Sequence, residues 1–171
     1  VETVTLDAGT GTTSVAAIGN STEIGALSIG TSDNGAITLN GAIVTDGAVA
    51  IDGPVTLATG SVSVTTADDA VTFSHTIDGN ETLTVNSGAG NVTFSDAIGA
   101  TTGLAGLSVN ASSGDGDITF TSTIGDADNA GVIGTTAVGN STTADLNFDG
   151  AIYKFDGGTT FTAVSSGSMD M

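Results

Sequence analysis

The chain of 171 residues has no Cys, no Trp and no Arg, and it has only one Lys, one His and one Pro. Without Cys there are no disulfides, zinc–thiolate sites or cysteine nucleophiles. A single cation cannot neutralise phosphates, which excludes nucleic acid binding through a basic surface and argues against binding to anionic membranes. No apolar run approaches the roughly 20 residues of a membrane-spanning helix, so we expect no membrane insertion. Because the chain begins at Val1 and shows no signal peptide, we expect a processed or excerpted product.

Acidic residues dominate the charge. Nineteen Asp and Glu stand against one Lys, giving a formal net charge of −18. The simpler interpretation is solubility in salty or acidic surroundings. The second interpretation is binding of a divalent cation, with Ca²⁺ as the candidate, because hard cations prefer oxygen ligands.

A short repeat organises the sequence. Its template is apolar-x-apolar, three small or polar residues, and another apolar residue, and clear copies occupy 71–77, 92–98, 118–124 and 146–152, with looser copies at 37–43 and 49–55. Val, Ile and Thr suit pleated strands, whereas the 26 Gly and the frequent Asn and Asp suit turns. The copies with Phe start at Val71, Val92, Ile118 and Leu146, so their spacing is similar but not constant. This recurrence predicts an all-β chain of stacked coils.

Two architectures fit short strands with frequent turns. One is a parallel β-helix, or β-solenoid, with coils of roughly 20–28 residues, and the other is an antiparallel β-sandwich or jelly-roll filament subunit. The phase of the repeat favours the solenoid, because equivalent residues of successive coils would form inward ladders. The expected ladders are Phe73, Phe94, Phe120 and Phe148; Val71, Val92, Ile118 and Leu146; and Ile77, Ile98, Ile124 and Ile152.

A longer similarity links two distant segments. Residues 17–29 read AIGNSTEIGALSI and residues 97–109 read AIGATTGLAGLSV, which we interpret as an internal repeat about 80 residues apart. We expect residues 1–171 to form a single all-β domain. Within it, residues 1–13 form an N-terminal strand and turn, 14–152 the repeat region, and 153–171 a C-terminal strand (161–164) and tail.

The units Val92–Gly99 and Thr101–Val109 resemble repeats of large secreted bacterial adhesins of the filamentous haemagglutinin type. The resemblance covers most of 14–152 and concerns the style of the repeat, since the spacing here is irregular and the secretion domain of that family is absent. It implies a parallel β-helix that works as a structural rod at the cell surface.

Candidate cation ligands lie in Gly-rich turns. One such turn is superficially similar to a calcium-binding loop and contains Asp126, Asp128 and Asn129, but the closing Glu of an EF-hand is missing. Asp115 and Asp117 could place two carboxylates close together. In both turns the favoured interpretation is a solvated Asx-rich turn, with Ca²⁺ binding as the alternative.

Other chemistry has few candidates. His75 has neither Cys nor a second His as a partner and is interpreted as a surface side chain, and Lys154 is expected to be solvated or paired with Asp156. A carbohydrate-binding or carbohydrate-processing β-helix is the alternative function, and its only candidates are Tyr153, Phe155 and Asp156. Catalysis by a basic residue is disfavoured because Lys154 is the only one.

These observations predict a secreted, extracellular, non-enzymatic structural protein at the cell surface. It would be an adhesin segment or a self-assembling filament subunit, with no catalytic or cofactor-binding residues. The expected partner is a second copy, joined head to tail through the strand-like termini. Host-surface or matrix glycans are the other candidate partners, and no cofactor is required apart from Ca²⁺ in the second interpretation above.

Overall fold

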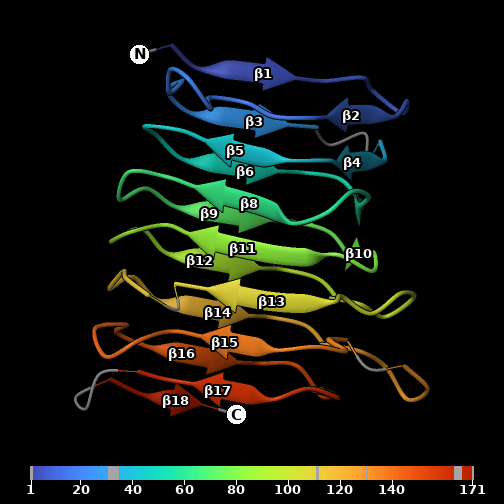
Figure 1. Ribbon diagram of the computed structural model, residues 1–171, viewed down its shortest axis with the longest axis vertical. Coiled ribbons are helices and arrows are strands. Elements are labelled where there is room, and N and C mark those ends of the chain that lie inside the picture. Colours follow the sequence, from blue (N-terminus) through green and yellow to red (C-terminus); the bar gives the residue numbers. More distant parts are fainter. Residues whose placement is uncertain (1, 31–34, 111, 130, 164–166, 171) are drawn as a thin grey trace.

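The computed structural model describes residues 2–30, 35–110, 112–129, 131–163 and 167–170. The described residues form strands, bridges and turns and contain no helix. Among them there is therefore no helix that could cross a membrane. The chain winds into a parallel β-solenoid of about seven turns, with β1 at one end of the stack and β18 at the other (Figure 1). Val1 and Val164, which were included in the predicted terminal strands, lie outside the described residues.

Three parallel sheets form the walls of the solenoid. Sheet A contains β1 (Val4–Leu6), β3 (Leu27–Ile29), β6 (Val49–Ile51), β9 (Val71–Phe73), β12 (Val92–Phe94), β14 (Ile118–Phe120), β16 (Leu146–Phe148) and β18 (Met169–Asp170). Sheet B contains β2 (Thr13–Val15), β4 (Ile37–Leu39), β7 (Val55–Leu57) and β10 (Ile77–Asp78). Sheet C contains β5 (Ala42–Val44), β8 (Val62–Thr65), β11 (Thr82–Asn86), β13 (Gly106–Val109), β15 (Thr136–Val138) and β17 (Thr159–Phe161).

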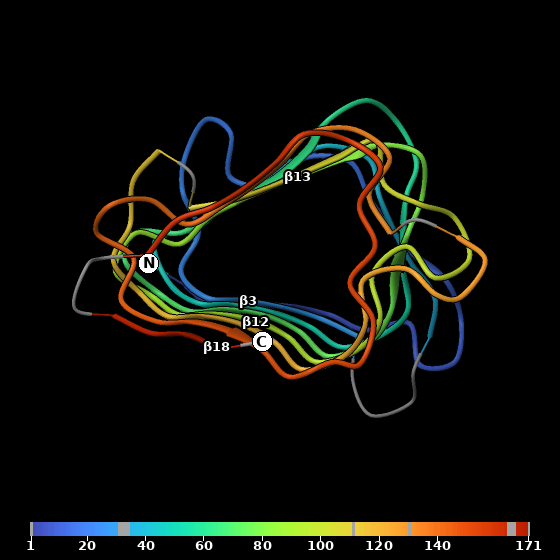
Figure 2. The same ribbon diagram turned by 90° about the horizontal axis from the view of Figure 1, so that it is seen from below.

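Each coil visits the walls in the order A, B, C, and the view along the axis shows sheets A and C on opposite sides of the cross-section (Figure 2). In sheet A, Val71 pairs with Val92 in one of the shorter coils, and Ile118 pairs with Leu146 in a longer one. Both coils lie within the predicted range of lengths. The predicted coil length and the preference for the solenoid over the sandwich are therefore confirmed.

The core follows from the alternation within three-residue strands. In β9, β12 and β14 the first and third residues of each strand point into the solenoid and are buried. The Thr between them faces outward and is partly exposed. Phe73, Phe94, Phe120 and Phe148 stack with ring centroids 4.9–5.3 Å apart and planes within 9° of parallel. The predicted Phe ladder and its Val/Ile/Leu neighbour are both confirmed.

The third predicted ladder is correct for three coils and wrong for the fourth. Ile77, Ile98 and Ile124 are joined by parallel bridges, but the next bridge is made by Tyr153, and Ile152 is 37% exposed. The corner after Phe148 holds one more residue than the corners before it. Because side chains alternate between faces, one extra residue turns Ile152 outward and brings Tyr153 inward.

The two similar segments do not occupy equivalent places. Leu27–Ile29 is a strand of sheet A, whereas the matching Leu107–Val109 lies in sheet C. The looser repeat copy at 37–43 is displaced in the same way, since it runs from sheet B to sheet C. The two copies of the internal repeat are therefore not separated by a whole number of coils. The shared pattern describes a corner between two strands, and each coil has three corners.

Candidate functional site

The corner between sheets C and A encloses a column of buried polar side chains. Each member directly follows a strand of sheet C and is at most 6% exposed: Thr45, Thr66, Ser87 and Asn110. The hydroxyls of the first three donate at 2.5 Å to carbonyl oxygens two or three residues further along, within the turn. These bonds satisfy backbone groups that the turn would otherwise leave unpaired in the interior.

Asn110 links successive coils at this corner. Its amide nitrogen donates to Ser87 Oγ at 2.9 Å, and its Oδ1 accepts the Ser87 backbone N–H at 2.8 Å. From the next coil, Asn140 Nδ2 donates to the carbonyl oxygens of Asn110 and Gly114 at 2.6 and 2.9 Å. Asn110 has a φ of 45°, a conformation that Asn tolerates better than most residues. The side chain is thus fully engaged in holding the coils together.

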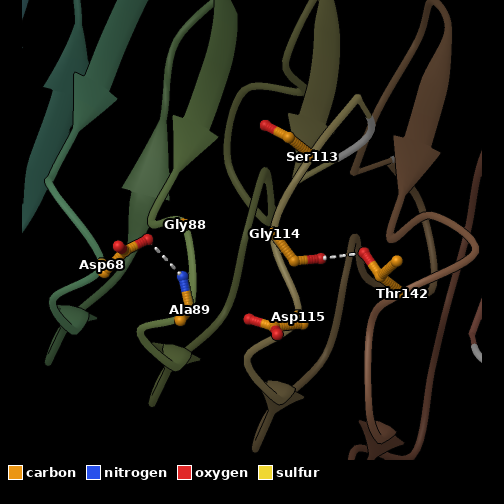
Figure 3. A pocket seen from close by; sticks show the side chains of 7 residues that line it. All are labelled: Asp68, Gly88, Ala89, Ser113, Gly114, Asp115 and Thr142. Atoms are coloured by element: carbon orange, nitrogen blue, oxygen red, sulfur yellow. Dashed lines mark hydrogen bonds between the residues drawn. The ribbon is translucent and has the colours of Figure 1, made fainter.

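A shallow hollow of about 360 Å³ lies on the outside of the same corner (Figure 3). The residues around it are Asp68, Gly88, Ala89, Ser113, Gly114, Asp115 and Thr142. Asp68 Oδ1 accepts the Ala89 N–H at 2.9 Å, and Thr142 Oγ1 donates to the Gly114 carbonyl at 3.0 Å. A Cβ on Gly88 would lie 2.1 Å from Asp68 Oδ1, so this contact requires glycine. The hollow is open, and the side chains of Asp68 and Thr142 at its edge bond to protein atoms.

Asp117 takes part in a second ladder, formed by the residues directly before β12, β14, β16 and β18 of sheet A. Asn91 Oδ1 accepts the Asp117 N–H, Asp117 Oδ1 accepts the Asp145 N–H, and Asp145 Oδ1 accepts the Ser168 N–H, at 2.7–3.1 Å. The Ser168 N–H and hydroxyl both donate to Asp145, which lowers the pKa of that carboxyl. We call Asn91, Asp117, Asp145 and Ser168 the Asx column. Asp115, the other member of the predicted pair, lines the hollow instead.

The turn at Asp126 folds on its own carboxylate. Asp126 Oδ1 accepts the backbone N–H groups of Asp128 and Asn129 at 2.8 and 2.7 Å. These two bonds, first from Asn129 and then from Asp128, lower the pKa of Asp126. The geometry is that of an Asx turn, with Asn129 also reaching the Ala100 carbonyl of the preceding coil at 3.3 Å. Across the parts of the chain that the structure describes, no three His, Cys, Asp or Glu side chains converge as a metal site would require.

The two basic side chains have partners on neighbouring coils. Lys154 Nζ donates to the Ala127 carbonyl at 3.1 Å in an exposed hydrogen bond above the Asp126 turn, and not to Asp156, the partner that the sequence offered as the alternative to solvation. His75 is partly exposed, as predicted, and its Nε2 lies 3.2 Å from Asp52 Oδ1. Both contacts join a residue to the coil before it.

The aromatic residues proposed for carbohydrate binding pack against other rings. Tyr153 meets Phe148 edge to face at 5.0 Å, and Phe155 meets Phe161 at 5.6 Å. The Tyr153 hydroxyl accepts the Gly150 N–H, and partial burial is the main cause that raises the pKa of this phenol. These two rings are partly buried in the last turn of the core.

Sequence reasoning did not find the buried polar column. A signal is present, since Thr45, Thr66 and Ser87 each follow an alternating strand and precede a turn with Gly or Asp. It could be interpreted only after the strands had been assigned to walls, because Ser and Thr also fill the outer faces. No family model matches this chain, and no curated protein or solved structure is significantly similar to it.

Proposed function

We propose that the chain is a structural module of a secreted, non-enzymatic protein, either a segment of a β-helical adhesin of the filamentous haemagglutinin type or a subunit of an extracellular filament. The observation that supports this proposal is the unbroken parallel register of sheet A from β1 to β18. A body of this kind is a rod whose length grows by one strand spacing, about 4.8 Å, with each coil. The Asx column bonds from coil to coil, and so does Asn110 of the buried column.

The end strands support assembly along the rod axis. Among the described residues, β1 pairs with β3 alone and β18 with β16 alone. The Val4 N–H and the Leu6 carbonyl bond to the β3 side, so the N–H and carbonyl of Thr5 face the open edge. Such an edge accepts one more parallel strand, from the same chain or from a second copy.

The test is a substitution that removes only the outward bond. Thr5→Pro deletes the N–H on the open edge and leaves the Val4 and Leu6 bonds to sheet A intact, and Thr5→Val is the matched control. We expect fibres of the wild type and of Thr5→Val in negative-stain electron microscopy, and short particles of Thr5→Pro. Fibres of all three proteins would contradict assembly through this edge, and short particles of all three would contradict the filament subunit and leave the adhesin segment.

Calcium enters this proposal as a factor that stiffens the rod. The acidic turns at Asp115 and Asp126 are the places where bound Ca²⁺ would relieve repulsion between carboxylates of neighbouring coils. We expect millimolar Ca²⁺ to raise the thermal midpoint, and Asp115→Asn or Asp126→Asn to reduce this gain. An equal midpoint in Ca²⁺ and in chelator would remove Ca²⁺ from the proposal and leave the structural role unchanged.

A further inference from the structure

A loop of the first coil stands out from the solenoid near the corner between sheets C and A (Figure 2). The residues on either side of it, Ile18 and Ile24, form parallel bridges to two residues of the next coil that have only Val44 between them. Residues 19–23 are therefore an excursion opposite a single residue of the neighbouring coil. Surface loops that contribute little to the core are where functional residues concentrate.

The tip of this loop carries a modification motif. Asn20, Ser21 and Thr22 are all exposed and lie outside the strands. None of the three has a hydrogen-bond partner among the residues that the structure describes. Asn-Ser-Thr is a sequon, the Asn-x-Ser/Thr acceptor of N-linked sugars, and such acceptors lie in surface loops of secreted proteins. The loop thus presents the whole motif to solvent.

The fold engages each of the four other sequons. Asn80 is exposed, but the Thr82 of its motif is the first residue of β11 and is held in the ladder of sheet C. Asn91 belongs to the Asx column, and its Oδ1 accepts an N–H of the next coil. Asn110 is fully buried, and Asn140 Nδ2 donates to two carbonyl oxygens. In these sequons the acceptor or its backbone already serves the coils.

The similar segment 97–109 offers a comparison within the molecule. Its loop reads Gly-Ala-Thr-Thr-Gly where residues 19–23 read Gly-Asn-Ser-Thr-Glu. The backbone N–H groups of Thr101 and Thr102 both donate to Asp78 Oδ1, at 2.8 and 2.9 Å, and tie that loop to the preceding coil. No such bond holds residues 20–23 among the described residues. Their backbone is free to adapt to the active site of a modifying enzyme.

We propose that Asn20 is the attachment site of an N-linked sugar. The donor is a glycosyl pyrophosphate, linked to a nucleotide or to a lipid. Asn20 Nδ2 forms a bond to the anomeric carbon, the bond from that carbon to the phosphate oxygen breaks, and the pyrophosphate leaves with the electron pair while the amide gives one proton to the enzyme. The Thr22 hydroxyl completes the motif that the transferase recognises. The proposal rests on the proposed secretion of the chain.

Cleavage after Glu separates the candidate sites. The three Glu of the chain divide it so that residues 3–23 contain Asn20, residues 24–81 contain Asn80, and the last fragment contains the other three sequons. Mass spectrometry of protein purified from the cells that make it should show added sugar on 3–23 alone. A single sugar residue would identify a nucleotide-linked donor, and a preassembled chain a lipid-linked one. A fragment 3–23 at its unmodified mass, or equal addition to another fragment, would overturn the proposal.

Substitutions made in the same cells test the chemistry. Asn20→Gln and Thr22→Ala should each abolish the added mass, whereas Thr22→Ser should keep it because the motif accepts either hydroxyl. Ala100→Asn creates the same motif in the tied loop and should remain unmodified at that position. Sugar that persists in Thr22→Ala would contradict N-linkage at Asn20, and equal modification of the tied loop would contradict selection by the free loop.

Electron microscopy of the same preparations separates this proposal from that of the filament. Fibres of a protein without sugar would overturn only the attachment site, and short particles of a protein with sugar on 3–23 would overturn only the filament subunit. Circular dichroism of each variant confirms that the coils are folded.

Discussion

The first coils and the last coils of the solenoid hold together in different ways. From β1 to β10, each coil forms strands in sheet B as well as in sheet A. Further down, sheet B is reduced to single bridges at Ile98, Ile124 and Tyr153, and the coils that begin at Val92 and Ile118 are longer than those above them. The lower coils thus lose part of one backbone ladder.

In the lower coils, where sheet B has fewer backbone hydrogen bonds, contacts between side chains hold adjacent coils together. The inward position filled by Leu6, Ile29 and Ile51 in the first coils is filled by the Phe stack from Phe73 onward. The position before each strand of sheet A is Ala26, Ala48 and Ala70 above and the Asx column below. The comparison teaches that the fold tolerates irregular coils when side chains of adjacent coils bond or stack directly.

The largest effect is expected from the Phe stack. Phe94→Ala removes a fully buried ring that contacts rings on both sides and should lower the free energy of unfolding by about 3–5 kcal/mol. Ile29→Val in the upper coils should lower it by about 0.5–1.5 kcal/mol. Urea denaturation measures both. A Phe94→Ala cost no greater than that of Ile29→Val would show that the stack does not stabilise the lower coils.

The buried polar column gives the next effect. Asn110→Gly keeps the positive φ available but leaves the buried Ser87 N–H without its acceptor, which should cost about 1–3 kcal/mol. Asn147→Gly, on the half-exposed outer face of β16, is the control for the loss of a side chain. Urea denaturation should rank Asn110→Gly as the more damaging substitution, and the reverse order would contradict a structural role for the column.

A smaller effect of opposite sign is expected at Thr136. Its hydroxyl is fully buried and is the one buried side-chain oxygen or nitrogen among the described residues without a hydrogen-bond partner. Thr136→Val keeps the shape and removes the desolvated hydroxyl, so we expect a gain of about 1 kcal/mol. Thr135→Val, at an exposed position next to it, should change the unfolding free energy little. A loss of stability in Thr136→Val would mean that the hydroxyl is satisfied.

The smallest effect concerns pH and the Asx column. Bonds from Ser168 lower the folded pKa of Asp145 below its usual 3.8, so its contribution to stability is present above that value and is lost as the pH falls through the folded pKa. Asp145→Asn should therefore be slightly less stable than the wild type at neutral pH, with a difference that shrinks on acidification. Thermal unfolding across pH measures this, with Asp170→Asn as the control. A difference that grows toward low pH would contradict the assignment.

The sequence was sufficient to predict the register of sheet A, the wall that carries the Phe stack. Apolar-x-apolar triplets at comparable spacing predicted the register of Val71, Val92 and Ile118 because few other alignments bury every Phe. Ile152 was misplaced because one added corner residue changes the face without disturbing the pattern of the strands. The similarity of segments 17–29 and 97–109 could not predict which wall each of them joins, because similar corners recur at different walls of the coil.

The candidate site was less predictable than the fold. The acidic turns were found, but their hydrogen bonds were not, because Asp126 bonds within its own turn while Asp117 bonds to Asp145 on the next coil. The buried polar column also needed the structure. Thr45, Thr66, Ser87 and Asn110 follow four different strands and lie together only when the coils are stacked.

The corners, finally, tell a protein engineer where new sequence can be inserted. Between Val92 and Leu146 the loops grow by several residues, yet Phe94, Phe120 and Phe148 keep their register. The Phe stack therefore keeps the strands of sheet A in register while the loops between these strands change in length. A peptide inserted in one of these longer corners would be displayed on the side of the rod while the Phe stack keeps the register of sheet A.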